Sequence, residues 1–210
     1  MRKYEEKLHF DKYYNKLQEN NVLQRYSGVV WGIAGYVLLY YFARYILAYI
    51  PDFRPWGDIE TWFAVGGVRF IKADLVYFTF GLILNCYGTV RLSKITVQNH
   101  SARSETGHMP QKLLVNGFYA KVRHPMYGTF IILQAGFMLS LRSFAGMIIA
   151  LIVIIIQYSN AIIEEKKQLK PIFGEEYNVY IKNVSCILLT RSQIAALVLA
   201  ALFSAAGFVF

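Results

Sequence analysis

Uncharged apolar residues are gathered into five runs along this chain, with polar segments between them. The run 143–163 contains no charged residue, and about 20 apolar residues are enough for a helix to cross a bilayer. The other runs are of broadly similar or shorter length. The one nearest the N-terminus is interrupted only by Arg44, and the run 73–90 has Asp74 at its edge. The five runs are 28–50, 73–90, 127–141, 143–163 and 192–210. This pattern predicts an all-α fold, a polytopic membrane helical bundle with about five transmembrane helices.

The polar segments predict how the chain is organised around these helices. Residues 1–27 are charged for too long to be a secretory signal, so we expect an interfacial amphipathic segment that precedes a membrane domain at 28–210. The segment 51–72 contains Trp56 and Trp62 among glycine and aspartate residues. Such a composition is typical of a loop or short helix in the membrane interface, where tryptophan rings lie at the level of the headgroups.

Composition and charge support a membrane protein with a defined orientation. Apolar residues make up 56% of the chain, against about 45–50% in soluble domains. Alternate polar segments carry 17 Lys and Arg residues on one side and 4 on the other. The positive-inside rule therefore predicts a cytoplasmic N-terminus, with the polar segments on both sides of the third and fourth spans facing the cytosol. This bias explains the net charge of +9 without a nucleic-acid partner.

Three residues inside or beside the spans could belong to a binding or metal site. Arg44 lies within the first span and either pairs with backbone carbonyls or binds an anionic headgroup. Cys86 and Cys186 lack the spacing of a metal site and indicate neither a metal centre nor a disulfide framework.

A first candidate motif lies where a basic loop meets the third apolar run, at residues 113–127 with the sequence LLVNGFYAKVRHPMY. Pro125 suits the first turn of a helix, so we expect a helix that begins near Met126 at the membrane surface. Its unpaired amides would face the loop. His124 then either caps this helix or forms part of the wall of a polar pocket.

A second candidate motif follows the fourth run and reads EEKKQLKPIFGEEYNVYIKNV, from Glu164 to Val184. Glu164 and Glu165 stand at the C-terminal end of an apolar helix, where a negative charge opposes the helix dipole. They are either a solvated face paired with nearby lysines or part of a site. Consecutive residues lie about 100° apart around a helix, so we expect only one of the two to face the pocket.

The third and fourth spans are expected to form a helical hairpin with its turn near residues 141–146. At about 1.5 Å per residue, Tyr127 and Glu165 then return to the same side of the bilayer. Carboxylates and aromatic rings in one pocket suit a sulfonium cation that also carries an amino group, and free amides suit its carboxylate.

Together the two motifs resemble the isoprenylcysteine carboxyl methyltransferase family and the related phospholipid methyltransferases. The first motif is similar to the family pattern G-x-Y followed by RHP-x-Y, and the second to EE-x-x-L followed by F-G-x-x-Y-x-x-Y, over residues 111–184. The resemblance implies a membrane methyltransferase that uses S-adenosylmethionine, with the hairpin forming the cofactor site. It also implies the residues that contact the cofactor. These are Gln111, Lys112, Leu113, Leu114, Tyr119, His124, Pro125, Met126, Tyr127, Glu164 and Glu165.

The chain departs from the family pattern at three places. Glu165 is aligned with the first glutamate of EE-x-x-L. Lys166 then occupies the position of the second motif glutamate, and Glu164 is an additional acid, unless the helix is shifted by one residue at Pro171. A glycine of the pattern is replaced by Thr129. The arginine that carboxyl methyltransferases associate with their substrate is Ala161 here, so Arg123 is the cation expected to replace it. Arg123 and Glu165 are thus the expected catalytic residues.

The predicted function is methyl transfer from S-adenosylmethionine to a lipophilic acceptor that enters from the bilayer. The first candidate acceptor is a prenylcysteine carboxylate, and the second is the amine of an ethanolamine phospholipid. An NADPH-dependent sterol-type reductase is a further alternative, because that class has a similar His-Pro-x-Tyr motif, and a scaffold that retains the pocket without catalysis is another. The sequence predicts contact with membrane lipids and leaves the oligomeric state open.

Overall fold

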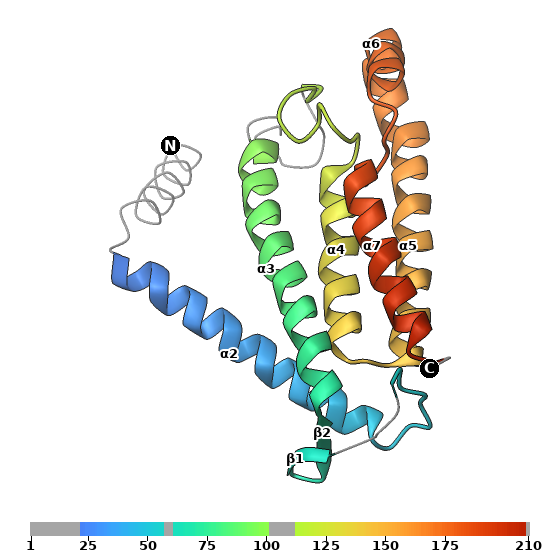
Figure 1. Cartoon of the computed structure of the whole chain (residues 1–210). Helices are drawn as coiled ribbons and strands as arrows, with labels where there is room; N and C mark the ends of the chain where they lie inside the picture. Colours follow the sequence, from blue (N-terminus) through green and yellow to red (C-terminus); the bar gives the residue numbers. More distant parts are fainter. Residues whose placement is uncertain (1–21, 57–60, 101–111, 209–210) are drawn as a thin grey trace. The chain divides into compact units, whose positions relative to one another are not determined.

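The computed structural model describes residues 22–56, 61–100 and 112–208 of the chain (Figure 1). Helices dominate this part, which confirms the all-α prediction. The helices are α2 (Val22–Leu47), α3 (Lys72–His100), α4 (Pro125–Ser140), α5 (Phe144–Glu164), the π-helical turn η1 (Glu165–Leu169), α6 (Lys170–Asn183) and α7 (Arg191–Ala206). The strands are β1 (Thr61–Val65) and β2 (Val68–Ile71).

Each of the five predicted spans coincides with a helix. Within the described residues, three segments are long and apolar enough to cross a membrane: Val29–Leu47, Lys72–Asn99 and the segment that begins with α5 at Phe144. Helices α4 and α7 have 16 residues each, or about 24 Å at 1.5 Å per residue. That is less than the hydrocarbon thickness of about 30 Å. The predicted N-terminal interfacial segment lies mostly outside the described residues.

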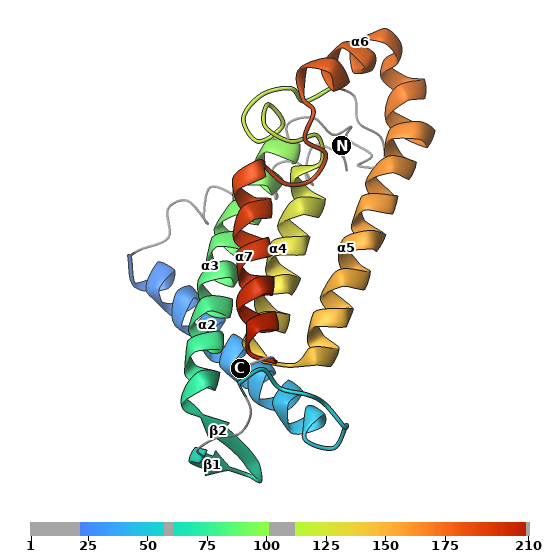
Figure 2. The same cartoon turned by 45° about the vertical axis from the view of Figure 1, so that its right-hand side comes forward.

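The chain packs as two compact units, Met1–Ala43 and Arg44–Phe210. In the second unit, α3 packs along α4 and α4 along α5, so that α4 is the central helix of the three (Figure 1). The turn between α4 and α5 spans only residues 141–143, which confirms the predicted hairpin. Helix α7 packs on α3, with Phe203 against the ring of Tyr77 and Gln193 bonded to the Tyr87 hydroxyl (Figure 2).

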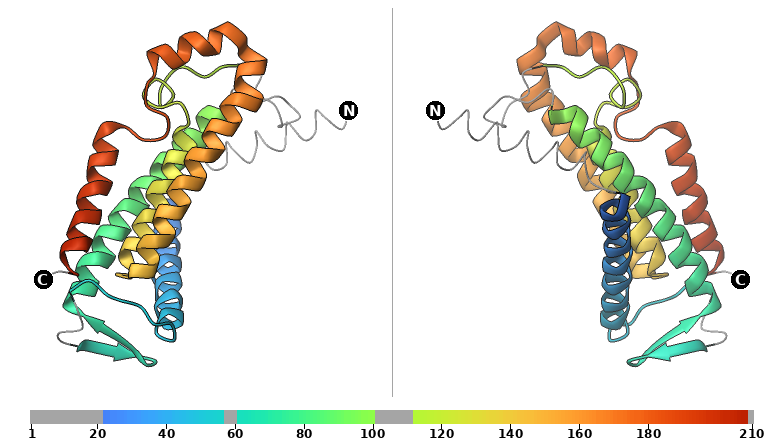
Figure 3. Two further views of the ribbon diagram at one scale, coloured as in Figure 1. Left: turned by 90° about the vertical axis from the view of Figure 1, so that its right-hand side faces the viewer. Right: turned by 90° about the vertical axis from the view of Figure 1, so that its left-hand side faces the viewer.

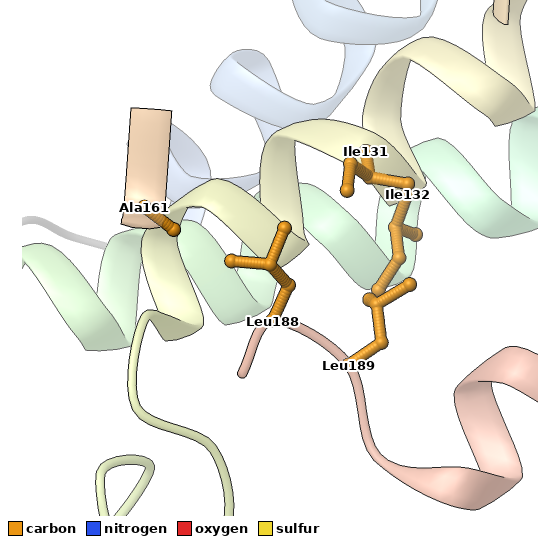
Figure 4. Close-up of a cluster of buried hydrophobic side chains, with 5 residues drawn as sticks. All are labelled: Ile131, Ile132, Ala161, Leu188 and Leu189. Carbon is orange, nitrogen blue, oxygen red and sulfur yellow. The ribbon is translucent and has the colours of Figure 1, made fainter. Parts of the chain in front are cut away.

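A small apolar core joins α4, α5 and the segment that leads into α7. It consists of Ile131, Ile132, Ala161, Leu188 and Leu189 (Figure 4). Most of the other large apolar side chains on these helices point outward, and Leu151, Ile155 and Leu199 are each more than 60% exposed. An apolar surface of this extent suits contact with lipid tails.

The segment predicted as a loop or short helix at 51–72 contains a β-hairpin instead. Strands β1 and β2 pair antiparallel, with Val65 opposite Val68. The two-residue connection is Gly66-Gly67, and both glycines have positive φ, at 54° and 81°. Tight hairpin turns of this kind require positive φ at both central residues, and the flanking Trp, Phe, Val and Ile residues favour strands.

Arg44 is completely buried at this end of the unit, where it shares a carboxylate with a second arginine. Its Nη1 lies 3.2 Å from Asp74 Oδ1, and the same oxygen accepts a hydrogen bond from Arg142 Nε at 2.7 Å. Arg44 also donates to the backbone oxygens of Leu141 and Arg69. Of the two interpretations of Arg44, these contacts support pairing with carbonyls, with a buried ion pair in addition.

Candidate functional site

The site is built around the start of α4, at the end of the unit opposite the β-hairpin. Pro125 occupies the first turn of α4 and His124 is the N-cap residue, but the His124 side chain makes no capping hydrogen bond. The backbone amides of Arg123 and His124 instead donate to Cys186 O and Ile187 O at 3.0 and 2.8 Å. These bonds fix the loop before α4 onto the segment 184–190 and leave both side chains to point elsewhere.

The imidazole of His124 lies between the two glutamates at the end of α5. Its Nε2 is 3.0 Å from Glu165 Oε1, and its Nδ1 is 3.5 Å from Glu164 Oε2. The Tyr127 ring stacks on the imidazole, with 5.8 Å between the ring centroids. Helix geometry predicted that only one of the two glutamates would face the pocket, whereas both carboxylates reach His124 from opposite sides of its ring.

Arg123 holds the other side of Glu165. Its Nε donates to Glu165 Oε1 at 2.8 Å, and its Nη1 donates to Val184 O at 2.9 Å. Glu165 is therefore buried against two cationic partners, while the side chain of Glu164 remains 31% exposed. Because Arg123 already contacts a carboxylate and a carbonyl, its contacts indicate a positioning role for its side chain.

The opposite charges of this cluster shift its pKa values so that the charged form of each group is favoured. Burial by itself lowers the pKa of His124, but hydrogen bonds and charges from Glu164 and Glu165 outweigh burial and raise it. Burial by itself raises the pKa of Glu165, but hydrogen bonds from His124 and Arg123, together with their charges, lower it to about 2. The cluster therefore favours an imidazolium between two carboxylates.

A π-helical turn explains how both glutamates reach the site. In η1 the amide of Lys170 donates to Glu165 O, five residues back, so the turn contains one residue more than an α-helical turn. The family pattern EE-x-x-L has one residue fewer than the sequence from Glu164 to Leu169. A π turn accommodates one additional residue, so Glu164 and Glu165 can take the places of the two motif glutamates. A one-residue shift of the helix at Pro171 is therefore not needed.

Helix α6 arches over the loop before α4 (Figure 3), and its motif tyrosines contact that loop. The Tyr180 hydroxyl donates to Tyr119 O at 2.7 Å, and Leu113 packs with Tyr177, Tyr180 and Val184 in a buried cluster. The Tyr177 hydroxyl is buried with no hydrogen-bond partner of normal geometry among the described residues. Burial, followed by the nearby Glu165 carboxylate, raises its pKa.

Other predicted cofactor residues lie on the opposite side of α4, facing α3. The Tyr119 hydroxyl donates to Asn99 Oδ1, and Asn99 Nδ2 lies 3.6 Å from Met126 Sδ. Lys112 is exposed and Leu114 is half-buried. Gln111 falls outside the described residues. The start of α4 is thus flanked by an α5-side cluster (Arg123, His124, Tyr127, Glu164, Glu165 and Tyr177) and an α3-side cluster (Arg91, Asn99, Phe118, Tyr119, Met126 and Thr129).

Sequence reasoning missed the contribution of α3 to this site. Arg91 donates to Thr129 Oγ1 at 3.0 Å, and Asn99 follows it two helical turns later on a similar face. The available signal was an arginine directly after the predicted span 73–90, followed by the polar pair Gln98-Asn99. Sequence reasoning also did not identify the packing role of Gly128. A Cβ at this position would lie 1.9 Å from Leu188 O. Only glycine allows the segment 184–190 to pass this close to α4.

The comparison with known families fits this arrangement. Residues 75–176 match the model of the phospholipid methyltransferase family, a region that runs from the first turn of α3 into α6 and holds most of both clusters. No curated protein and no solved structure matches the chain. The family match and the apolar helices together support an integral-membrane methyltransferase.

Proposed function

We propose that this phospholipid methyltransferase family member transfers a methyl group from S-adenosylmethionine to an amphiphilic acceptor that enters from the bilayer. The observation that carries the proposal is the α5-side cluster, in which His124 lies 3.0 Å from Glu165 and 3.5 Å from Glu164 at the mouth of a membrane hairpin. Carboxylates beside aromatic rings suit a ligand that carries both an ammonium and a sulfonium group.

The residues of this cluster fit the cofactor. The carboxylate of Glu164 is partly exposed and can accept a hydrogen bond from the ligand's ammonium, while the Tyr177 hydroxyl is buried beside Glu165 without a hydrogen bond of normal geometry. The rings of Tyr127 and Tyr177 flank the two carboxylates and can stabilise a positive charge. Arg123 and His124 keep Glu165 in place. When bound, S-adenosylmethionine supplies an electrophilic methyl group, whose bond to sulfur breaks with both electrons kept on sulfur as the acceptor's lone pair attacks.

The protein contributes orientation and a dry environment more than acid–base chemistry. A direct displacement requires the reacting atoms about 3–3.5 Å apart and in line. The ion pairs around Glu165 and the close approach of Leu188 to Gly128 hold the start of α4 rigidly between α3 and α5. Such rigidity favours positioning catalysis.

The two candidate acceptors differ in what the site offers them. A prenylcysteine carboxylate requires a cation, but Ala161 is fully buried in the apolar core and Arg123 is engaged by Glu165.

We further propose that the site faces the cytosol, because the basic segments 91–126 and 164–191 flank it.

The experiment uses the purified full-length chain in detergent and in vesicles. Calorimetry measures binding of S-adenosylmethionine and, separately, of NADPH. Transfer of a labelled methyl group is then measured to vesicles with ethanolamine phospholipid, to a prenylcysteine analogue, and without an acceptor. We expect binding of S-adenosylmethionine and transfer to one lipid acceptor, with Glu176→Gln, an exposed change on α6, as the unaffected control. Binding of NADPH alone would instead support a reductase, and cofactor binding without transfer to any lipid would support a scaffold.

A further inference from the structure

A cavity of about 490 Å³ lies at the end of the second unit that carries the β-hairpin. Its walls come from residues between Leu47 and Arg54, where α2 ends, and from Gly67 and Arg69 of the hairpin (Figure 1). The candidate site lies at the opposite end of α4, about 24 Å away at 1.5 Å per residue. A volume of this size is typical of ligand pockets, and its position separates it from the site of methyl transfer.

The hairpin wall of the cavity is held by the buried ion cluster of Arg44 and Asp74. Arg44 Nη2 donates to Arg69 O at 3.1 Å, and Asp74 Oδ2 accepts from the Ile71 amide at 2.8 Å. Both bonds use the backbone of β2, so neither occupies the Arg69 side chain. Its two neighbours in β2 are buried, whereas Arg69 is exposed. Alternate residues of a strand point to opposite faces, so this side chain points away from the buried face.

The other wall of the cavity is fixed to the start of α5. Phe53 O accepts from the Phe144 amide at 3.0 Å, and Asp52 Oδ1 accepts from the Ala145 amide at 3.1 Å. The second carboxylate oxygen of Asp52 is buried. The acidic residue of the lining is thus committed to α5. Because hydrogen bonds anchor both walls, the cavity is formed before any ligand enters.

The lining has an apolar part and a cationic part. Leu47, Ile50 and Phe53 provide apolar side chains, and Arg54 and Arg69 provide positive charge. A guanidinium presents a planar fork of donors that matches two oxygens of a phosphate. Apolar side chains beside arginines therefore suit an amphiphile whose polar end carries a phosphate.

The cavity lies at the level expected for lipid headgroups. The candidate span Val29–Leu47 ends at its wall, and the candidate span Lys72–Asn99 begins three residues after Arg69. Phe53 and Trp62 are 76% and 57% exposed at this end, as expected of aromatic residues in the membrane interface. We propose that the cavity binds the phosphate of an anionic phospholipid from the leaflet opposite the candidate site, as a bound lipid that is not methylated.

This lipid differs from the methyl acceptor in chemistry as well as in place. A glycerol headgroup has neither an amine nor a carboxylate, so it cannot receive the methyl group in the proposed reaction. A choline or ethanolamine headgroup carries a cation that would meet the two arginines, while Asp52 is already bonded to α5. The cavity therefore favours an anionic headgroup, and the bound lipid connects the end of α2 with the β-hairpin.

The test compares Arg69→Gln with Lys72→Gln, which removes one positive charge from an exposed position three residues away that does not line the cavity. Arg69→Gln keeps the backbone oxygen that Arg44 binds, so we expect it to fold. Calorimetry on the full chain in an uncharged detergent measures binding of short-chain phosphatidylglycerol, short-chain phosphatidylcholine, glycerol 1-phosphate and S-adenosylmethionine.

We expect phosphatidylglycerol to bind more tightly than phosphatidylcholine, which carries a cation, and than glycerol 1-phosphate, which lacks the apolar chains. Loss of a charge-assisted hydrogen bond in Arg69→Gln should weaken phosphatidylglycerol binding about tenfold or more. Lys72→Gln should change that affinity by less than about threefold. The affinity for S-adenosylmethionine should be the same in both variants and in the unchanged chain.

The remaining outcomes would overturn the inference in different ways. Equal weakening in Arg69→Gln and Lys72→Gln would indicate a general attraction of surface charge, and equal affinity for the two lipids would remove the preference for an anionic one. Glycerol 1-phosphate that binds as tightly as phosphatidylglycerol would make a soluble phosphate ester the ligand in place of a lipid. If Arg69→Gln does not fold, Arg54→Gln must show the same loss, and unchanged phosphatidylglycerol binding in that variant would contradict the inference. None of these outcomes depends on methyl transfer, so the proposed function is tested separately.

Discussion

His124 Nε2 and Glu165 Oε1 lie 3.0 Å apart, although 41 residues separate them in the chain. The second imidazole nitrogen faces Glu164 at 3.5 Å. An imidazole can donate to two carboxylates at once only when it is protonated. The two carboxylates at the junction of α4 and α5 therefore favour the protonated form of His124, and the stability of the junction should depend on pH.

We expect the melting temperature in detergent to be highest between about pH 4.5 and pH 6.5. The folded pKa of His124 is raised above 6.5, so its contribution is complete below that pH and is lost as pH rises through the folded pKa. The folded pKa of Glu165 is lowered to about 2 from 4.5, so its contribution is complete above pH 4.5 and is lost as pH falls toward 2. His124→Gln should remove the decline on the alkaline side. A decline of the same size in His124→Gln would show that another group is responsible.

The two glutamates should respond differently to the same substitution. Glu165→Gln leaves Arg123 buried without a carboxylate, which should cost about 3–5 kcal/mol of stability, as the loss of one partner of a buried pair typically does. Glu164→Gln leaves that pair intact and should mainly reduce S-adenosylmethionine affinity, by about tenfold. Thermal melting and calorimetry measure the two effects. Equal loss of stability in both variants would contradict this division of roles.

Deletion of Lys167 tests the π-helical turn. The shortened sequence reads EEKQL, which has the EE-x-x-L spacing, and an α-helical turn can replace η1. We expect the deletion variant to fold and to bind S-adenosylmethionine within about threefold of the unchanged chain, a difference below about 0.7 kcal/mol. Deletion of Ile155 in the middle of α5 is the control and should abolish binding, because it rotates Glu164 and Glu165 away from His124. Equal damage by the two deletions would mean that the π geometry itself is required.

Asp74 should be a stability determinant remote from the site. It is the carboxylate shared by Arg44 and Arg142, and all three side chains are almost completely buried. Asp74→Asn removes the charge of the carboxylate that these two buried cations share and should cost about 3–5 kcal/mol. Glu175→Gln, at an exposed position of α6, is the control. Cofactor affinity of any folded fraction should not change, which calorimetry on protein below its melting temperature checks.

Labelling of single cysteines tests the predicted orientation. In a chain without Cys86 and Cys186, cysteines are placed at Phe53 and at Glu176, both exposed and at opposite ends of the second unit. An impermeant thiol reagent applied to intact cells should label position 53 and spare position 176. Labelling of position 176 from outside would reverse the topology and place the site away from a cytosolic cofactor.

The sequence by itself determined the helices and indicated the two motifs that form the candidate site. Runs of uncharged residues specify spans because a helix in lipid must satisfy its backbone internally, so every predicted span became a helix. Pro125 marks the start of α4 because proline fits only the first turn of a helix. The order and spacing of the two motifs were sufficient to indicate the family resemblance, which the match over residues 75–176 supports.

Only the tertiary structure decided which side chains meet at the site. The shared contact of Glu164 and Glu165 with His124 depends on a π turn, which local sequence does not specify because it differs from an α turn by one hydrogen-bond register. Arg44, Arg91 and Arg123 bond side chains that lie 30, 38 and 42 residues away along the chain. An arginine in an apolar run signals that a partner is needed, but packing alone determines whether that partner is a carboxylate, a carbonyl or a hydroxyl.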